Sequence, residues 1–233
     1  MNDRLERARA AANMVEGWLT AAEGELLFTL AASCPPGGTI VEIGSWKGKS
    51  TTWLAGGAGQ GRGIRIFAID PHEPYLADPQ ADSLRDFRAN LERLGLTALV
   101  TPIVGRSQAA AASFDHQIDV LFIDGDHEEG PVTADVALWL PKVRPGGWVA
   151  LHDVRNRKWP GVSRALSRLL WRSTTVADVR FADSIAAVRT VARNTLGDRL
   201  RNRFWAVCLR VYGSFPTVPP SLAAILRKLV FRP

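Results

Sequence analysis

The sequence predicts an α/β protein built on one doubly wound, mostly parallel β-sheet. From about residue 38 onward, short β-branched segments alternate with longer amphipathic stretches, which is the pattern of βαβ units. The segments Val120–Ile123 and Trp148–Leu151 are apolar throughout, as expected of parallel strands that are buried on both faces. Hydrophobic residues make up 46% of the chain and charged residues 22%, which excludes disordered, collagen-like and coiled-coil classes.

The predicted elements follow one another in a regular order. Strands are predicted at Thr39–Ile43, Arg65–Ile69, Ala98–Val104, Val120–Ile123 and Trp148–Leu151, with a hairpin at Thr174–Phe181 and Ile185–Val191. Helices are predicted from Gly48, then at about Asp82–Leu94, Ser107–Ser113 and Pro131–Leu140, and again after Pro160. The Pro145-Gly146-Gly147 segment is predicted to be a turn that leads into the fifth strand. The result is a Rossmann-like, seven-stranded, mostly parallel sheet with helices on both faces.

Three regions are predicted along the 233 residues: an N-terminal helical cap at 1–35, the Rossmann-like domain at 36–193 and a basic amphipathic helical tail at 194–233. Residues 1–153 hold 13 basic against 20 acidic side chains, whereas residues 154–233 hold 16 against 3. In the tail, Leu196–Tyr212 and Ser221–Phe231 have amphipathic patterns. This basic region suits an acidic partner, an anionic membrane surface or self-association, and an ordinary solvated or docked surface explains it equally well.

The sequence shows no sign of export or of a membrane span. The first ten residues mix both charges, and no apolar run approaches the roughly 20 residues of a membrane helix. Cys34 and Cys208 lack the spacing of a metal site and suit a reducing compartment. A cytoplasmic location is therefore expected.

Glycines follow the first predicted strand, where the chain turns sharply into a helix and backbone can approach a ligand closely. A phosphate-binding P-loop needs four residues between its first glycine and Gly-Lys-Ser, but only three stand between Gly44 and Gly48. The dinucleotide fingerprint Gly-x-Gly-x-x-Gly is broken by Ser45 and Trp46. NTPases and hydride-transferring dehydrogenases therefore fit this turn poorly.

The same turn resembles that of the class I S-adenosylmethionine-dependent methyltransferases, in which Glu-x-Gly-x-x-x-Gly follows the first strand and an acidic residue closes the second. Here that acidic residue is Asp70, whose carboxylate can accept both ribose hydroxyls of the cofactor. Ser50 either caps the next helix or lends its hydroxyl to the cofactor, and Ser107 is open to the same two interpretations. The resemblance implies cofactor binding by Glu42, Gly44, Ser45, Gly48, Ser50, Asp70, Arg106, Ser107 and Asp124.

Ionisable residues follow the two apolar strands, with Asp124 after the first and His152 and Asp153 after the second. If these strands are neighbours, about 4.8 Å apart, both carboxylates can converge on one divalent cation at about 2.1 Å, which removes their repulsion. His127 lies three residues beyond Asp124, about one helical turn. A histidine titrates near neutrality and can there take the proton of an acceptor hydroxyl.

Together, Asp124-Gly125-Asp126-His127, Asp135 with Trp139, Pro145-Gly146-Gly147 and His152-Asp153 resemble the macrocin-type O-methyltransferases, over about residues 12–191. These enzymes methylate sugar hydroxyls. The resemblance implies S-adenosyl-L-methionine as cofactor, Mg²⁺ or a similar ion on Asp124 and Asp153 with His152 as third ligand, and His127 as catalytic base. Relatives often carry an acid at the position of His152.

Two alternatives remain at this point. The first is a metal-independent small-molecule methyltransferase that uses His127 as base, and its activity would survive chelation. The second is a nucleic-acid-binding module that uses the basic tail, whose binding would depend steeply on salt. The acidic residues of the predicted cleft disfavour a phosphodiester, so a small hydroxylated acceptor, for example a saccharide, is the expected partner.

Overall fold

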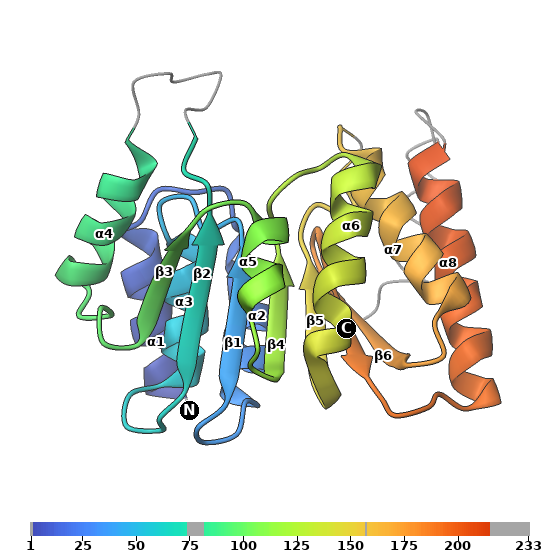
Figure 1. Ribbon diagram of the computed structural model, residues 1–233, viewed down its shortest axis with the longest axis horizontal. Coiled ribbons are helices and arrows are strands. Elements are labelled where there is room, and N and C mark those ends of the chain that lie inside the picture. Colours follow the sequence, from blue (N-terminus) through green and yellow to red (C-terminus); the bar gives the residue numbers. More distant parts are fainter. Residues whose placement is uncertain (1, 74–81, 157, 215–233) are drawn as a thin grey trace.

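The computed structural model describes residues 2–73, 82–156 and 158–214. Within them, seven strands form one sheet in the order β3-β2-β1-β4-β5-β7-β6 (Figure 1). Strands β1 to β5 pair in parallel, and a β6–β7 hairpin adds antiparallel strands beyond β5. The strands are β1 (Thr39–Ile43), β2 (Arg65–Asp70), β3 (Val100–Val104), β4 (Ile118–Ile123), β5 (Val143–Leu151), β6 (Val176–Ala182) and β7 (Ile185–Thr190). The predicted seven-stranded, mostly parallel Rossmann-like sheet is confirmed.

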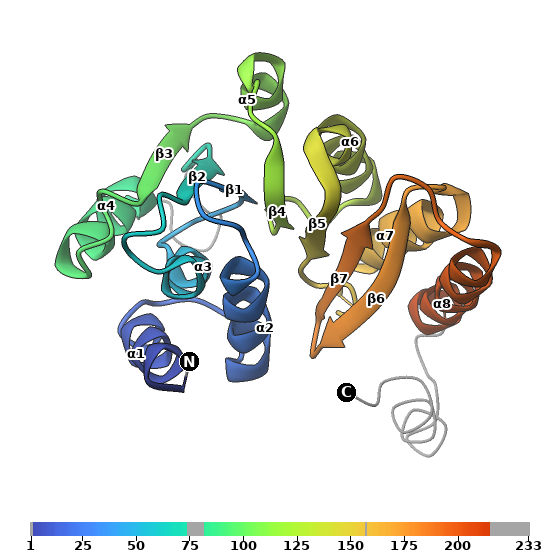
Figure 2. The same cartoon turned by 90° about the horizontal axis from the view of Figure 1, so that it is seen from below.

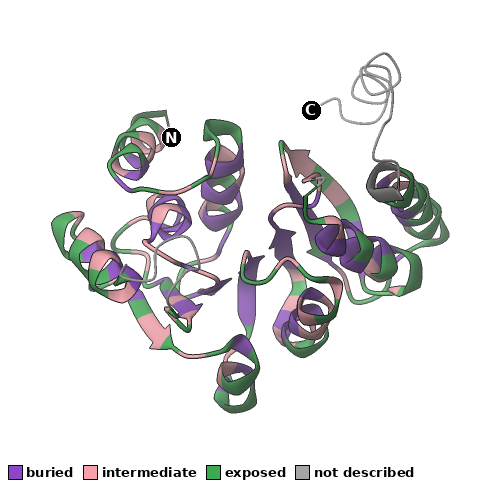
Figure 3. Ribbon diagram, turned by 90° about the horizontal axis from the view of Figure 1, so that it is seen from above, coloured by how far each residue is buried: buried purple, intermediate pink, exposed green. Residues whose placement is uncertain are grey.

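Helices cover both faces of the sheet (Figure 2). On one side of the sheet lie α1 (Asn2–Asn13), α2 (Ala21–Ala32), α3 (Lys49–Ala58) and α4 (Ser83–Arg93), and on the other side lie α5 (Ser107–Ser113), α6 (Glu129–Trp139), α7 (Pro160–Arg172) and α8 (Leu196–Ser214). A short 3-10 helix, Leu140–Lys142, precedes β5. Because side chains alternate along a strand, Val120 and Phe122 belong to the apolar core on the side of α1 to α4, whereas Leu121 and Ile123 belong to the core on the side of α5 to α8. Figure 3 shows the central strands buried between helices whose outer sides are exposed, whereas the edge strands β3 and β6 are only partly buried.

The order of the strands places a ligand crevice at the centre of the sheet. Strand β1 pairs with β2 on one side and with β4 on the other, so the winding of the chain reverses between β1 and β4. Open α/β sheets bind ligands beyond the carboxyl ends of their strands at such a point. Gly44 follows β1 and Asp124 follows β4, which brings both to this crevice.

Strand β5 is longer than predicted. It begins at Val143, so Pro145-Gly146-Gly147 lies inside the strand, and the predicted turn was wrong. Gly146 adopts a φ of +90°, and the register of the β4–β5 pairing shifts between Ile118 and Val120. The Pro-Gly-Gly segment is therefore accommodated as an irregularity of the ladder, as in a β-bulge, and does not end the pairing.

The first amphipathic stretch of the tail forms α8, which packs against α7 and β6. The second predicted stretch, Ser221–Phe231, lies outside the described residues. At the other end of the chain, α1 and α2 pack against α3, and residues 14–20 lead from one to the other. No helix in the described part of the chain is long and apolar enough to cross a membrane.

Candidate active site

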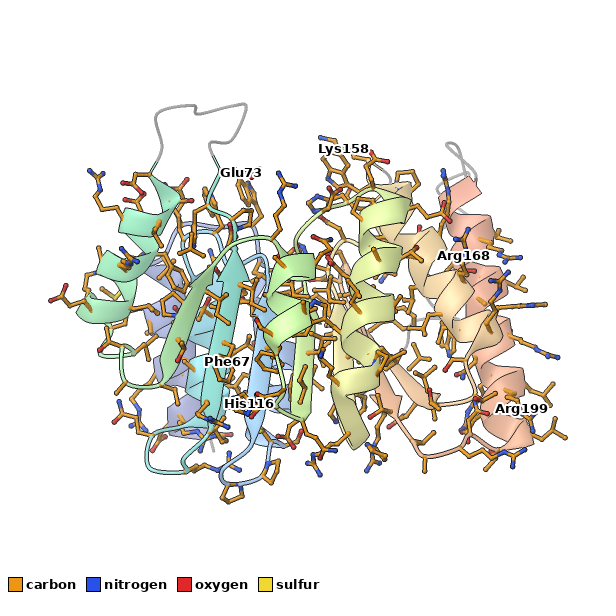
Figure 4. The ribbon with its side chains drawn as sticks, viewed as in Figure 1. Phe67, Glu73, His116, Lys158, Arg168 and Arg199 are labelled. Atoms are coloured by element: carbon orange, nitrogen blue, oxygen red, sulfur yellow. The ribbon has the colours of Figure 1, made fainter. Side chains whose placement is uncertain are left out.

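A cavity of about 1200 Å³ opens beyond the carboxyl ends of β1, β2, β4 and β5. Small-molecule pockets usually measure about 300–1,000 Å³, so this one has room for a cofactor together with an acceptor. Residues 17–20, between α1 and α2, contribute to its wall. Glu73 and Lys158, which are labelled in Figure 4, also line it and lie at this end of the molecule.

The floor of the cavity is the glycine turn after β1. Gly44 has a φ of +86°, and its amide donates a hydrogen bond to the Ile69 carbonyl at 2.8 Å. A Cβ atom at Gly44 would lie 2.1 Å from the carbonyl oxygen of Asp124, so only glycine fits between the two chain segments. The next residue, Ser45, is buried and lines the cavity, and its hydroxyl has no hydrogen-bond partner among the described residues. An unpaired buried hydroxyl at this position fits a bound cofactor.

Asp70, at the end of β2, is held beside this turn by backbone amides. Its two carboxylate oxygens accept hydrogen bonds from the amides of Trp46 at 2.8 Å and His72 at 2.7 Å. Each oxygen keeps a further lone pair, so the carboxylate can still accept two hydroxyl donors from the cavity. This geometry agrees with the predicted role of Asp70 in binding a ribose.

Not every residue of the predicted cofactor site reaches the cavity. Gly44, Ser45, Ser50, Asp70, Arg106, Ser107 and Asp124 line it, whereas Glu42 and Gly48 do not. Gly48, with a φ of +92°, is the N-cap of α3 and lies against Phe87. Glu42 is fully buried beneath the turn and accepts a hydrogen bond from the Thr51 hydroxyl. Burial raises the pKa of Glu42 to about 8, although the hydroxyls of Ser50 and Thr51 oppose this.

Arg106 and Ser107 lie on the far side of the cavity, at the start of α5. Arg106 forms an exposed ion pair with Glu73 at 2.8 Å. The Ser107 hydroxyl donates to the carboxylate of Asp135 on α6, which also accepts from Gln108 at 3.2 Å. Burial raises the pKa of Asp135. The structure thus brings the predicted Ser107 together with Asp135 in one polar corner.

The predicted metal ligands come together at the ends of β4 and β5. One ligand atom from each of Asp124, His152 and Asp153 lies within 4.8 Å of the others. The Nδ1 atom of His152 lies 2.9 Å from Asp124 Oδ1. Asp153 has a φ of +56°, a backbone conformation that non-glycine residues rarely adopt. Strained backbone of this kind is frequent at functional sites.

The predicted base, His127, adjoins the same cluster. Its Nε2 atom lies 2.9 Å from Asp153 Oδ2, and its ring stacks on Trp159 with centroids 4.8 Å apart. The hydrogen bond to Asp153 raises the pKa of His127, and burial opposes this shift. An imidazole that is oriented by a carboxylate and faces a cavity can accept a proton from a bound ligand.

Residues 41–154, from within β1 to just beyond β5, match a family model described as a methyltransferase domain. The matched segment lies within the region 36–193 that was predicted to be the Rossmann-like domain. All of the predicted site residues lie inside the matched segment, from Glu42 to Asp153.

The chain is also similar to a viral protein. A protein of Acanthamoeba polyphaga mimivirus, described as uncharacterized, is 39% identical over 137 residues, which are 57% of this chain and 59% of that protein. The chain thus spans about three fifths of the length of that curated relative.

Several solved structures share the fold of this chain. The O-methyltransferase TomG from Streptomyces achromogenes, solved with S-adenosylmethionine, has a TM-score of 0.60 at 20% identity over 81% of this chain and 90% of that one. A TDP-rhamnose 3′-O-methyltransferase of calicheamicin biosynthesis has a TM-score of 0.53 at 20% identity over 71% of this chain and 76% of that one. At these identities the likeness concerns the fold.

Sequence reasoning did not point to Glu23, which lies on α2, outside the matched segment 41–154, and contacts the cluster through His152. Its Oε2 atom lies 3.6 Å from His152 Nε2, and its Oε1 atom accepts a hydrogen bond from the Ser184 amide at 2.8 Å. Burial would raise the pKa of Glu23, but contacts with His152, Ser184 and Thr20 lower it to about 2. The sequence signal was the capping box Thr20-x-x-Glu23, which marks the start of α2 and says nothing about the site.

Glu23 changes the expected role of His152. Burial lowers the pKa of His152, but Asp124 and Glu23 on either side of the ring outweigh it and raise the pKa to about 10. A protonated imidazole donates from both nitrogens and has no lone pair for a metal. The carboxylates of Asp124 and Asp153 have the oxygen donors that Mg²⁺ prefers, so these two residues fit a divalent cation. His152 fits as the third ligand only in its neutral form.

Proposed function

We propose that the chain is an S-adenosylmethionine-dependent O-methyltransferase that acts on a hydroxyl of a saccharide or a saccharide-containing metabolite. The observation that carries this proposal is the position of Asp70 beside the Gly44 turn, in the same cavity as the His127–Asp153 pair. The cavity therefore offers carboxylate oxygens that can accept hydrogen bonds from a ribose, and it also offers a base beside an open space.

The cofactor half of the site would be built from four parts of the chain: the turn after β1, strand β2, helix α5 and helix α6. The backbone at Gly44 lets the ligand approach closely, and the Ser45 hydroxyl offers an unused hydrogen-bonding group. Asp70 accepts the ribose hydroxyls, while Ser107 and Asp135 form the polar corner proposed for the adenine end. These residues would hold the cofactor in the same cavity as His127.

Proton transfer is assigned to His127. Its free ring nitrogen accepts the proton of the acceptor hydroxyl, and Asp153 stabilises the imidazolium that forms. When bound, S-adenosylmethionine supplies a sulfonium methyl group, to which the acceptor oxygen bonds while the carbon–sulfur bond breaks and leaves S-adenosylhomocysteine. Trp159 holds the plane of the His127 ring through this step.

A divalent cation, when bound, would be held by Asp124 and Asp153, with neutral His152 as a third ligand. Its chemistry would be to bind the acceptor oxygen and lower the pKa of the hydroxyl. The saccharide acceptor is supported by the resemblance to macrocin-type enzymes and by the fold shared with a TDP-rhamnose 3′-O-methyltransferase.

One observation favours a second candidate, a metal-independent methyltransferase. His152 is held between Asp124 and Glu23, and as an imidazolium it supplies the positive charge that two neighbouring carboxylates need. In this candidate His127 remains the base, and no cation is required.

The test is release of S-adenosylhomocysteine from S-adenosylmethionine in the presence of hydroxylated saccharides, measured before and after dialysis against EDTA. The proposal predicts acceptor-dependent release that chelation suppresses and added Mg²⁺ restores. Release that persists after chelation would assign the metal-independent candidate. No release with any hydroxylated acceptor, from protein that binds the cofactor, would contradict the proposed acceptor class.

A further inference from the structure

Helix α8 carries an apolar stripe on its outer side. The stripe consists of Leu196, Leu200, Phe204, Val207 and Val211, which are between 41% and 66% exposed. Because an α-helix turns by about 100° per residue, these five positions lie within an arc of about 80° on one helix face. Contiguous exposed apolar surface of this kind marks an interaction site more often than isolated apolar residues do.

The opposite side of α8 is fixed to the rest of the molecule. Asn202, Ala206 and Leu209 are buried there. The Asn202 side chain donates to the Val176 carbonyl at 2.7 Å, and the Ser167 hydroxyl donates to the Ala206 carbonyl at 2.9 Å. Rotating the helix to bury its stripe would leave these buried polar groups without partners, which is costly. These contacts therefore fix the orientation of α8 so that the stripe faces outward.

Arginines border the stripe. Arg199, Arg203 and Arg210 are exposed and lie along its edge, and the guanidinium groups of the last two lie 5.5 Å from the ring of Trp171 on α7. Figure 4 shows Arg199 at the outer edge of α8. The helix contains one acidic residue, Asp198. The surface is thus apolar at its centre and strongly basic beside it.

The positive charge of these arginines disfavours two other occupants of the stripe, which are a second copy of the chain and residues 215–233. A second copy of the chain, seated face to face, would bring the arginines of one α8 against those of the other. Residues 215–233 contribute Arg227, Lys228 and Arg232 and no acidic side chain. Like charges at an interface weaken binding and disfavour the pairing. The complementary occupant is one that is anionic and apolar together.

We propose that α8 docks on the surface of an anionic lipid bilayer. The stripe would lie about 5–10 Å deep at the boundary between headgroups and acyl chains, as in interfacial amphipathic helices. The arginines beside it would bind lipid phosphates, which guanidinium groups can contact in bidentate fashion. The helix would lie in the plane of the surface. This inference does not depend on the proposed methyl transfer.

The experiment is flotation of the full chain with vesicles of phosphatidylcholine alone and of phosphatidylcholine mixed with phosphatidylserine. The wild-type protein is expected to float with the anionic vesicles and to detach as salt rises, because salt screens the contacts of arginine with phosphate. The double variant Leu200→Glu/Phe204→Glu is expected to bind the anionic vesicles at least about 10-fold more weakly than the wild type, since two apolar side chains are no longer removed from water on binding. Arg203→Glu/Arg210→Glu should weaken binding to anionic vesicles as well.

The matched control is Leu138→Glu on α6, where an apolar side chain of 42% exposure lies outside α8, and it should leave binding unchanged. Circular dichroism melts verify that each variant is folded. The proposal is overturned if the wild-type protein does not float, or if the stripe variant floats as well as the wild type. In that case light scattering identifies what covers the stripe. A wild-type dimer that the stripe variant dissociates would indicate a second copy of the chain, and monomers of both proteins would indicate residues 215–233.

Discussion

At the scale of single residues, the surroundings of His127 are those of a general base. Asp153 orients its ring and Trp159 supports the plane of that ring. Replacing His127 with glutamine preserves a polar side chain but removes the base, so we expect kcat to fall by about 10²- to 10⁴-fold. The affinity for S-adenosylhomocysteine should stay within about 2-fold of the wild type, because the cofactor residues are untouched. Steady-state kinetics with calorimetry check both values, and an unchanged kcat would remove His127 from the mechanism.

Glu42 makes a prediction about pH. Its pKa rises from 4.5 to about 8 in the folded protein, so the folded state retains a proton that the unfolded chain releases. The resulting stabilisation is complete below pH 4.5 and is lost as the pH rises through 8. Glutamine at this position cannot titrate, so the stability of Glu42→Gln relative to wild type should increase over that range. Urea unfolding at a series of pH values measures the difference, and two parallel pH profiles would contradict the prediction.

At the scale of elements, the turn between β1 and α3 depends on glycine for a steric reason that the sequence could only suggest. We expect Gly44→Ala to destabilise the fold by more than about 3 kcal/mol, because its Cβ atom would lie 2.1 Å from a backbone oxygen. Gly61→Ala is the matched control: Gly61 has a φ of +79° with nothing within 4 Å, so only backbone strain of about 1 kcal/mol is expected. Denaturant unfolding compares the two variants. Equal losses would mean that contact with the chain after β4 is unimportant.

Element boundaries were predictable where a local pattern determined them. The bounds Thr39–Ile43 and Ser107–Ser113 agree with the structure, because a short β-branched run and an alanine-rich stretch each define one element. The start of β5 was not predictable, since Pro145-Gly146-Gly147 is typical of a turn and becomes part of a strand only through pairing with β4. The amphipathic pattern predicted α8 but did not indicate which side of the helix packs against the rest of the molecule. The buried side is the one that contains Asn202.

At the scale of the whole molecule, the sheet and the central cluster could be predicted because parallel strands end at a common edge. Asp124 and Asp153 were placed together from their positions after two apolar strands, His127 from its spacing after Asp124, and His152 from the family resemblance. Glu23 could not be predicted, because its contact with His152 depends on how α2 packs beside the sheet. The electrostatics of the site therefore arise from the tertiary arrangement, even though most of its residues are visible in the sequence.

The most direct test of the account is calorimetric titration of S-adenosylhomocysteine into the wild-type protein and into Asp70→Ala. The account predicts micromolar binding by the wild type, and loss of at least about 100-fold in affinity when two hydrogen bonds to a charged acceptor are removed. Asp115→Ala, at a carboxylate that is 88% exposed and lies outside the cavity, should bind like the wild type. Wild-type protein that binds no S-adenosylhomocysteine, or an Asp70→Ala variant that binds it equally well, would contradict the account.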